Sequence, residues 1–371
     1  MENSTNTFHP LIVDAHEDLA WNMTTFQRDY TLSAEEIRQQ ELNGFAPTVN
    51  GDTLLGWQDY QRGRIAVVFG ASFVLPSRFK KADWETQSYA TPQQAHTLYR
   101  KQIDSYHRLA DQSPEKFRLV RTRNDLEEIL RDWDNPLKPN HPVGLVLLME
   151  GAEGIQQPGE TELWWELGVR IIGPAWAGTR FCGGTNEPGS LTKDGYELLA
   201  SMADHGFILD ITHMDAHAAL QALESYPQAM IASHSNAQRL LKGIENNRHL
   251  PDEVIHGLIE REGIIGVVLF NGFLRAGWKR GDNRQLVTLQ QVVAQIDYIC
   301  QMAGNAQHVG IGTDFDGGFG LQSAPADVDT IADLQKLTPL LEQKGYSTID
   351  IANILGGNWL RLLRQRLPET T

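Results

Sequence analysis

The sequence of 371 residues contains only two cysteines, Cys182 and Cys300, and they lie far apart in the chain. Two cysteines cannot give a chain of this length a disulfide framework, so a reducing compartment is the simplest expectation. The sequence also lacks an apolar run long enough to span a bilayer. Its first residues have neither the basic nor the apolar segment of a signal peptide, and its last residues form no hydrophobic tail for a lipid anchor. We therefore expect a cytoplasmic protein without a membrane partner.

Basic residues are scarce relative to acidic ones, with 32 Lys and Arg against 47 Asp and Glu and a net charge of −15. Unspecific binding to nucleic acid needs a basic face, so this balance argues against a nucleic-acid partner. It does not exclude a small anionic substrate, because one arginine can bind a carboxylate whatever the total charge. A content of 41% hydrophobic and 21% charged residues is typical of a globular protein and suggests neither a disordered nor a fibrous chain.

Short apolar runs rich in β-branched residues alternate with helical stretches, which is typical of repeated βα units around a parallel sheet. Eight such runs predict a (β/α)₈ TIM barrel in the α/β class, formed as a single domain over residues 1–371 with an insertion after the first strand, at about Trp21–Arg62. The predicted strands are Leu11–Ala15, Ile65–Ala71, Gly144–Met149, Val169–Pro174, Phe207–Ile211, Ala229–Ser233, Ile264–Phe270 and Val309–Gly312.

Capping residues support the helices between these strands. Ser33 and Thr91 are each followed three residues later by Glu or Gln, which is the pattern of a capping box. Thr192 begins a helix that we expect to end at Gly206, in a left-handed C-cap.

The most unusual side chains follow the predicted strands, at the end of the barrel where active sites of this fold lie. A single histidine at a strand end is more often a hydrogen-bonded structural residue than a metal ligand. A glutamate at the end of a buried strand is rarer, because it must be desolvated. Five strand ends carrying imidazole or carboxylate groups are hard to produce by chance. They contribute His16, Asp18, Glu150, His213, His234, Asp314 and Asp316.

Imidazole and carboxylate groups are good ligands for zinc and similar divalent ions. Five ligands are too many for one tetrahedral zinc with an open position, but they suit two ions that share a bridging carboxylate. We expect His16 and Asp18 to hold one ion, His213 and His234 the other, and Glu150 to bridge them. Zinc is the metal expected first, although this ligand set also suits manganese, iron or cobalt.

Seven short motifs, in an order that spans nearly the whole chain, resemble those of the membrane (renal) dipeptidases, peptidase family M19. The family belongs to the amidohydrolase-like metal-dependent hydrolases. The motifs are Asp14-Ala-His16-Glu-Asp18-Leu, Glu150-Gly-Ala-Glu-Gly, Asp210-Ile-Thr-His213, Ser233-His234-Ser-Asn-Ala, Asn247-Arg248-His-Leu-Pro-Asp, Gly312-Thr-Asp314-Phe-Asp-Gly and Gly356-Gly-Asn-Trp-Leu.

The resemblance implies a zinc-dependent dipeptidase for substrates with a free C-terminal carboxylate, often with a D-residue at that end. It implies the same ligand set, with Arg248 binding the substrate carboxylate and Asp314 as the catalytic acid–base. Taken alone, Arg248 would be read as part of a surface salt bridge. Asp316 competes for the base role, but as the second aspartate we expect it to be a structural turn residue. The family is commonly dimeric, which implies a homodimer.

The segment Gly168–Trp176 departs from the family, which has a histidine where this chain has Trp176. An indole donates one hydrogen bond but carries no positive charge, and losing one oxyanion donor typically costs about 10²–10³ in rate. We hypothesise that Trp176 reshapes the substrate pocket and that Arg180 replaces part of the lost positive potential. Simple packing of Trp176 in the pocket wall is an equally good interpretation.

Two other functions compete with a dipeptidase. Trp176 keeps open a related barrel hydrolase that acts on another carboxylate-bearing amide or lactone, such as an N-acyl amino acid. A barrel that has lost catalysis and only binds ligands would be expected to lack at least one of the five ligands or Asp314. A dinucleotide site is excluded, because no G-x-G-x-x-G opens a helix after a strand.

Overall fold

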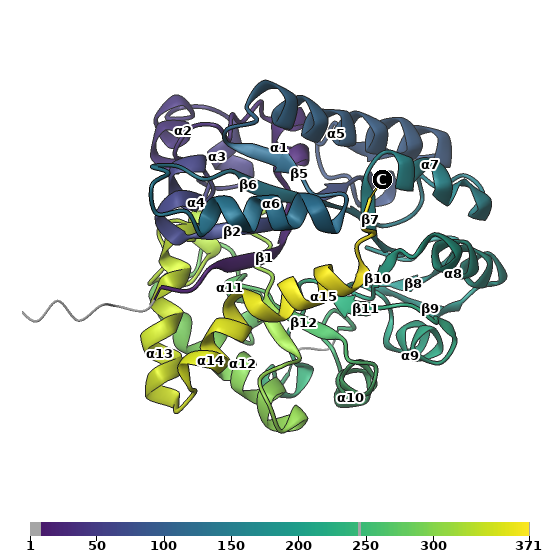
Figure 1. Cartoon of the computed structure of the whole chain (residues 1–371). Coiled ribbons are helices and arrows are strands. Elements are labelled where there is room, and N and C mark those ends of the chain that lie inside the picture. The colour runs from purple at the N-terminus through teal and green to yellow at the C-terminus, as the bar shows by residue number, and fades with distance from the viewer. Residues whose placement is uncertain (1–8, 244–245, 371) are drawn as a thin grey trace, which may run out of the picture.

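Eight parallel strands form a closed barrel in the computed structural model, which describes residues 9–243 and 246–370 (Figure 1). Each strand pairs in parallel with its neighbours, and the pairing of β2 with β6 closes the ring. The strands are β1 (Ile12–Glu17), β2 (Ile65–Phe73), β6 (Val143–Glu150), β7 (Val169–Gly173), β10 (Ile208–Asp210), β11 (Met230–Ala232), β12 (Ile264–Val267) and β13 (Val309–Ile311). The predicted barrel is confirmed, and observed strand bounds differ from the predicted ones by at most three residues.

Among the described residues, five short strands lie outside the ring of eight, and the sequence did not predict them. β5 (Phe117–Leu119) pairs with the first three residues of β6, and β7 pairs with β6 from Leu147 onward. β3 (Leu75–Pro76) and β4 (Ser88–Tyr89) pair within the loop that follows β2. β8 (Cys182–Gly184) and β9 (Glu187–Leu191) form a hairpin in the loop that follows β7. The loops after β2 and β7 therefore contain regular secondary structure at the C-terminal mouth of the barrel.

Helices surround the barrel, as the alternating pattern predicts (Figure 1). Helix α15 packs against α6 as well as against β1 and β13. The helices that follow barrel strands from β2 onward are α5 (Pro92–Gln112), α6 (Arg123–Trp133), α7 (Thr161–Glu166), α8 (Lys193–His205), α9 (Ala216–Ser225), α10 (Asp252–Glu260), α11 (Asn271–Leu274), α12 (Leu289–Ala303), α13 (Leu337–Lys344), α14 (Thr348–Ala352) and α15 (Asn358–Arg366).

The predicted helix caps are mostly observed. Ser33 forms a complete capping box, and Thr192 caps α8, which ends at Gly206 with a left-handed φ of 81°. At α5 the expected box is incomplete. The Thr91 hydroxyl accepts from the backbone N–H of Gln94, but the Gln94 side chain accepts from Ala90 instead of Thr91.

The insertion after β1 contains the short helices α1 (Leu19–Thr25), α2 (Ala34–Gln40), α3 (Ala46–Val49) and α4 (Trp57–Gly63). The buried carboxylate of Asp316 anchors it to the loop after β13. This carboxylate accepts hydrogen bonds from Arg28 Nη1 at 3.0 Å, from Tyr30 at 2.8 Å and from the backbone N–H of Leu54 at 3.0 Å. The Thr53 hydroxyl donates to it as well. Asp316 is thus the structural residue that the sequence predicts.

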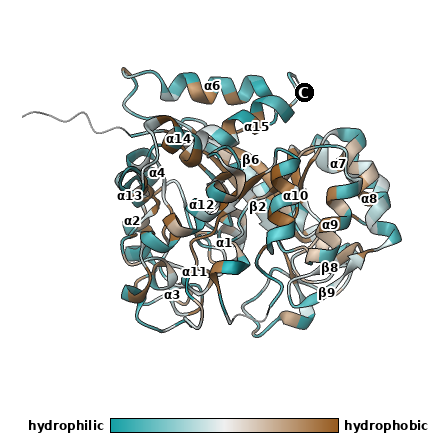
Figure 2. Cartoon of the chain, turned by 90° about the horizontal axis from the view of Figure 1, so that it is seen from below, coloured by the Kyte–Doolittle hydropathy of each residue, from teal (hydrophilic) through white to brown (hydrophobic). Residues whose placement is uncertain are grey.

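The strands are buried along nearly their whole length, and Figure 2 shows hydrophobic segments toward the centre with hydrophilic colour at the periphery. Close packing beside His234 demands glycine at two positions. A Cβ atom on Gly266 or Gly312 would lie 1.9 or 1.8 Å from the carbonyl oxygen of Ser233. The neighbouring strands β12 and β13 can therefore approach the chain that presents His234.

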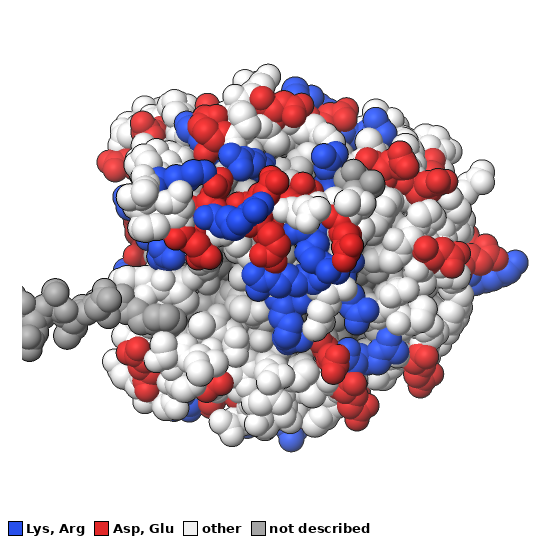
Figure 3. All heavy atoms as spheres, in the orientation of Figure 1, with Lys and Arg blue, Asp and Glu red and all other residues white. Residues whose placement is uncertain are grey.

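The surface carries acidic and basic side chains mixed together. In Figure 3 basic spheres gather over α15, next to acidic and basic spheres over α6. One ion pair joins these two helices, with Arg364 Nε 2.6 Å from Glu127 Oε1. Within residues 9–243 and 246–370, no helix is long and apolar enough to cross a membrane.

Candidate metal centre and substrate site

Six of the predicted site residues meet at the C-terminal mouth of the barrel. His16 lies in β1 and Glu150 is the last residue of β6, while the others follow their strands by one to three residues. Parallel strands place all these ends at the same mouth. The residues brought together are His16, Asp18, Glu150, His213, His234 and Asp314, and most are almost completely buried.

Glu150 lies between two groups of candidate ligands. Its Oε1 atom is 3.0 Å from His213 Nε2 and 3.4 Å from His234 Nε2, and these two nitrogens are 3.1 Å apart. Its Oε2 atom is 3.7 Å from His16 Nε2, which in turn is 3.6 Å from Asp18 Oδ2. Ligand atoms around a tetrahedral zinc with bonds of about 2.0–2.1 Å lie roughly 3.3 Å apart. The separations on the Oε1 side are therefore those of atoms that can share one ion.

Hydroxyl groups fix the orientation of the two imidazoles beside Glu150, and sequence reasoning missed them. Thr185 Oγ1 lies 2.9 Å from His213 Nδ1, and Ser233 Oγ lies 2.8 Å from His234 Nδ1. Ser233 donates its proton to Asp210 Oδ2 at 2.5 Å, so it accepts from the Nδ1–H of His234. The lone pair of His234 then lies on Nε2, which faces Glu150 and can bind a metal.

Burial shapes the ionisation of the site. It lowers the pKa values of His213 and His234 well below the usual value, so both rings are neutral donors of a lone pair. Burial raises the pKa of Glu150 well above its usual range. For His16 burial acts downward, but the carboxylates of Glu150, Asp18 and Asp314 outweigh it and raise the pKa to about 10.

The site fits divalent cations. Three carboxyl groups, those of Asp18, Glu150 and Asp314, surround His16 in a nearly dry space, where unpaired negative charge is costly. Among the described residues, neither ring nitrogen of His16 nor Oδ1 of Asp18 has a hydrogen-bond partner. Two overlapping triads have ligand atoms within 4.8 Å of one another. They are His16, Glu150 and His234, and His16, Asp18 and Asp314.

Asp314 lies at the edge of this cluster. Its Oδ1 atom is 4.0 Å from His16 Nε2, and its side chain is 14% exposed. Its backbone has a left-handed φ of 60°, and its N–H donates to the carbonyl of His16 at 3.1 Å. Burial raises the pKa of the Asp314 carboxyl to about 8, helped by the negative charge of Asp18 and opposed by His16 and Arg248. A group with this pKa can both accept and return a proton near neutral pH.

Arg248 is buried beside the cluster instead of lying on the surface. Its Nη2 donates to the carbonyl of His234 at 2.8 Å, and its guanidinium lies 5.0 Å from the ring of Phe273. Among the described residues, its Nε atom has no partner. Burial lowers the pKa of Arg248, while the negative charges of Asp314 and Glu150 oppose that shift. The guanidinium therefore has free donor capacity for an anionic group.

Trp176 lies against the candidate ligands. Its ring is 6.0 Å from the ring of His213, and its Cβ lies near Gly151, the residue after Glu150. It also packs against two half-buried aromatic residues, Phe73 at 5.2 Å and Phe79 at 5.5 Å between ring centres. Trp176 is thus an element of the wall of the site.

Arg180 does not reach the ligands through any hydrogen bond of the described residues. Its Nη1 lies 2.8 Å from Glu153 Oε2, and its Nη2 donates to the carbonyl of Ile155. The positive charge that the sequence assigns to the oxyanion is therefore offset by Glu153. This ion pair could not be inferred from the sequence, because the two residues come from different loops.

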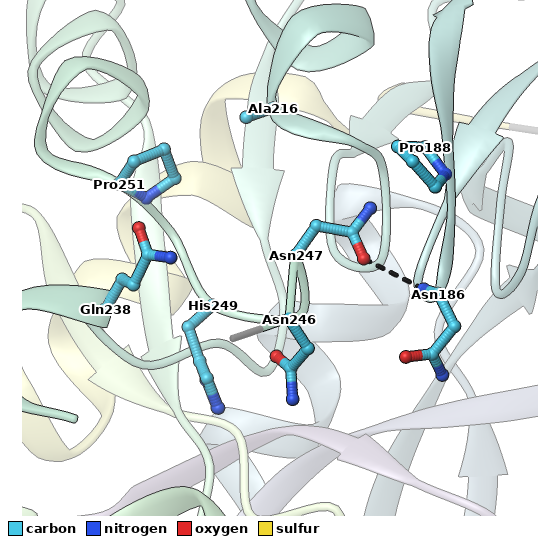
Figure 4. Close-up of a pocket in the computed structure, with 8 residues that line it drawn as sticks. All are labelled: Asn186, Pro188, Ala216, Gln238, Asn246, Asn247, His249 and Pro251. Carbon is cyan, nitrogen blue, oxygen red and sulfur yellow. Dashed lines mark hydrogen bonds between the residues drawn. The ribbon is translucent and has the colours of Figure 1, made fainter. Parts of the chain in front are cut away.

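A separate cavity of about 450 Å³ lies beside the segment that carries Arg248 (Figure 4). Its polar lining includes Asn186, Gln238 and Asn246, and the backbone N–H of Asn186 donates to Asn247 Oδ1 at 2.8 Å. None of the six residues of the metal cluster lines it. The lining of this cavity is therefore distinct from the candidate metal centre.

A TIM barrel with buried imidazole and carboxylate groups at its C-terminal mouth defines a metal-dependent hydrolase of the amidohydrolase kind. The sequence matches the family "Membrane dipeptidase (Peptidase family M19)" over residues 6–369. The chain belongs to this family of metallopeptidases, as the motifs predict.

The chain is also similar to individual proteins and to a solved structure. Dipeptidase verJ of Clonostachys rogersoniana is 26% identical over 81% of this chain and 73% of its own length. An uncharacterised protein from the pqqA 5′ region of Klebsiella pneumoniae is 32% identical over 60% of this chain and 82% of its own length. A metallopeptidase from Rhodobacter sphaeroides, crystallised with a phosphinate mimic of L-Ala-D-Ala, has the same fold. It gives a TM-score of 0.77 at 22% identity, covering 97% of this chain and 100% of that one.

Proposed function

We propose that this protein hydrolyses dipeptides with a free C-terminal carboxylate, including L-Xaa-D-Xaa dipeptides, with two divalent ions, zinc in the first instance. The ligands are His16, Asp18, Glu150, His213 and His234. The observation that carries the proposal is the position of Glu150, whose two carboxylate oxygens face two different groups of ligands. The phosphinate analogue of L-Ala-D-Ala bound to the Rhodobacter relative supports the substrate class.

When bound, divalent ions supply electrostatic stabilisation of the carbonyl oxygen and lower the pKa of a water molecule. Arg248 binds the C-terminal carboxylate in a charge-assisted pair and so fixes the scissile amide over Glu150. Asp314 accepts the proton of the attacking water on its carboxylate. It then returns this proton to the amide nitrogen as the C–N bond breaks, which leaves two amino acids.

Trp176 contributes shape to the pocket, and its indole N–H offers at most one hydrogen bond to the carbonyl oxygen. Arg180 stays outside the proposed chemistry because Glu153 already binds its guanidinium. If the Arg180→Ala variant folded normally but lost most of its kcat on several amides, the hypothesis that Arg180 stabilises the oxyanion would hold after all.

The experiment that tests the function is hydrolysis of L-Xaa-L-Xaa and L-Xaa-D-Xaa dipeptides by the zinc-reconstituted protein and its Asp314→Asn variant. We expect turnover that falls by about 10²–10⁴ in Asp314→Asn, because the proton acceptor is lost. Elemental analysis of both proteins serves as the control for metal content. Full activity of Asp314→Asn would remove Asp314 from the mechanism.

A second candidate function is hydrolysis of another carboxylate-bearing amide or lactone, such as an N-acyl amino acid. The aromatic surroundings of Trp176 favour it, because they offer apolar contact to an acyl group. If the protein hydrolysed N-acyl amino acids but no dipeptide, this second function would replace the dipeptidase. The homodimer and the cytoplasmic location expected from the sequence stay predictions, which sedimentation and cell fractionation would test.

A further inference from the structure

Three half-buried aromatic side chains form a continuous surface beside the metal cluster, which we call the aromatic wall (Phe73, Phe79 and Trp176). Trp176 is central, with ring-centre distances of 5.2 Å to Phe73, 5.5 Å to Phe79 and 6.0 Å to His213. Half-exposed aromatic rings at the mouth of a buried polar site are typical of surfaces that bind apolar ligand groups.

The wall is built from two loops that are fastened together. Phe79 ends a short 3₁₀ helix after β3, while Trp176 lies between β7 and β8. Arg78 joins the loops by donating to both oxygens of Glu187, at 2.8 and 2.7 Å, and to the carbonyl of Gly178 at 2.6 Å. A bidentate pair has a defined geometry. It therefore holds Phe79 against Trp176.

Phe73 is held independently, at the end of β2. The buried amide of Gln102 accepts from the backbone N–H of Phe73 at 2.9 Å and donates to its carbonyl at 2.6 Å. Both backbone groups of Phe73 are therefore bound by one side chain from α5. The wall is a preformed surface, so a ligand that binds it does not have to order it first.

The part of the wall that follows β2 lies across the barrel mouth from Arg248. Around the closed ring the strand order is β1, β2, β6, β7, β10, β11, β12 and β13, so β2 and β11 are diametrically opposite. Phe73 ends β2, and Arg248 donates to the carbonyl of His234, two residues after β11. A dipeptide whose carboxylate is bound by Arg248 and whose amide lies over Glu150 extends its other residue toward β2.

Two carboxylates beside the wall are already paired. Glu187 is bound by Arg78, and Glu153, in the loop after β6, is bound by Arg180. Neither carboxylate therefore offers an uncompensated negative charge to a ligand at this side of the mouth. Apolar contact with the rings remains the main interaction that these loops provide.

We infer that the aromatic wall is a specificity subsite that binds a large apolar or aromatic group on the acyl side of the scissile bond. In a dipeptide this group is the side chain of the N-terminal residue, and in an N-acyl amino acid it is the acyl chain. Arg78 is a positioning residue, because it acts on the ligand only through Phe79. The inference rests on the proposed function, in which Arg248 binds the carboxylate.

The test compares kcat/KM for L-Phe-D-Ala and L-Ala-D-Ala in the wild type and in Phe79→Ala. We expect the wild type to prefer the Phe substrate by about 10-fold or more, since burying the larger side chain gains contact with the wall. In Phe79→Ala this ratio should fall about 5- to 10-fold. The matched control is Phe45→Ala, which removes a half-exposed ring that packs on Trp84 at 5.8 Å.

Arg78→Met tests the positioning role. The ion pair with Glu187 is about half exposed, so its loss should leave the fold intact. We expect KM for L-Phe-D-Ala to rise about threefold while kcat stays within twofold, because Phe79 loses its fixed position but the chemistry is untouched. A fall in kcat for both substrates, with an unaltered preference, would give Arg78 a different role.

Binding of phosphinate dipeptide analogues, measured by calorimetry, separates failure of the subsite from failure of the proposed function. The analogues carry Phe or Ala in the N-terminal residue. Tighter binding of the Phe analogue that is lost in Phe79→Ala supports the wall even if no dipeptide is hydrolysed. Hydrolysis of both dipeptides with no preference overturns the wall and leaves the dipeptidase intact. Equal binding of both analogues overturns the wall whether or not the dipeptides are hydrolysed. N-acyl amino acids with short and long chains distinguish the two kinds of acyl group.

Discussion

The two sides of the barrel mouth differ in how they hold their side chains. On the β10 and β11 side, His213 and His234 are buried, and hydroxyl groups fix their Nδ1 atoms. On the β2 and β7 side, Phe73, Phe79 and Trp176 are half-buried, and they are held through their backbones and neighbours. Buried polar groups need every partner in place, whereas an apolar ring tolerates changes that preserve its volume.

This difference indicates that the polar side serves the chemistry and the aromatic side serves substrate preference. Changes on the polar side should abolish chemistry or metal binding, because each group has a charge or lone pair that nothing nearby replaces. Changes on the aromatic side should alter substrate preference and leave turnover of small substrates measurable.

Glu150→Gln should reduce kcat/KM by roughly 10³-fold or more, since the carboxylate that faces both ligand groups loses its negative charge. Elemental analysis should show less than the wild-type metal content. Glu153→Gln is the matched control, because Glu153 binds Arg180 and no candidate ligand. Wild-type metal content and activity in Glu150→Gln would contradict the bridging role.

Arg248→Met should reduce kcat/KM by about 10²-fold, mainly through a higher KM, because a buried charge-assisted pair with the substrate carboxylate is lost. Arg131→Met removes a highly exposed arginine and should have no effect. Dipeptide amides, which lack the carboxylate, should be poor substrates for the wild type and no worse for Arg248→Met. Equal loss on acids and amides would assign Arg248 a structural role.

Thr185→Val keeps the shape of the side chain but removes the hydroxyl that contacts His213 Nδ1. We expect metal affinity to fall about 10- to 100-fold, because the imidazole loses its fixed orientation. Competition with a chelator measures this affinity, and Thr97→Val on the surface of α5 is the control. Unchanged affinity would mean that packing against Trp176 alone orients His213.

Metal removal should make stability depend on pH. Folding raises the pKa of Asp314 from 3.8 to about 8 and that of His16 from 6.5 to about 10, whereas it lowers the pKa values of His213 and His234. Above about pH 7.5 the two histidines with lowered pKa values are neutral in both the native and the unfolded state, so the native metal-free protein binds more protons there than the unfolded chain. Its stability should therefore fall as pH rises from about 7.5 to 10. We expect a decrease in Tm on the order of 5 °C from pH 7.5 to pH 9.5, measured by calorimetry. Zinc should abolish this decrease, and a Tm that rises with pH would contradict it.

The sequence predicted the barrel and the residues at its strand ends because both depend on local patterns. Apolar runs mark the strands. Parallel strands of a barrel end at the same mouth, so Glu150 and His213 come together whatever conformation the connecting loops adopt. Thr185 and the Arg180–Glu153 pair could not be predicted, because they depend on how the β8–β9 hairpin and neighbouring loops fold over the mouth. Ser233 could have been suspected, since the second ring nitrogen of a metal-binding histidine almost always has a hydrogen-bond partner and Ser233 is adjacent to His234.

Asp316 has a consequence for the evolution of the mouth. Its carboxylate ties Arg28, Tyr30 and Leu54 to a position two residues after Asp314. An insertion anchored at this point cannot change its position or be exchanged without displacing Asp314, the proposed proton acceptor. The loops after β2 and β7 have no such tie to Asp314 among the described residues. We expect natural variation in substrate preference to accumulate in those loops, while the Asp316 anchor and the chain it binds change together or not at all.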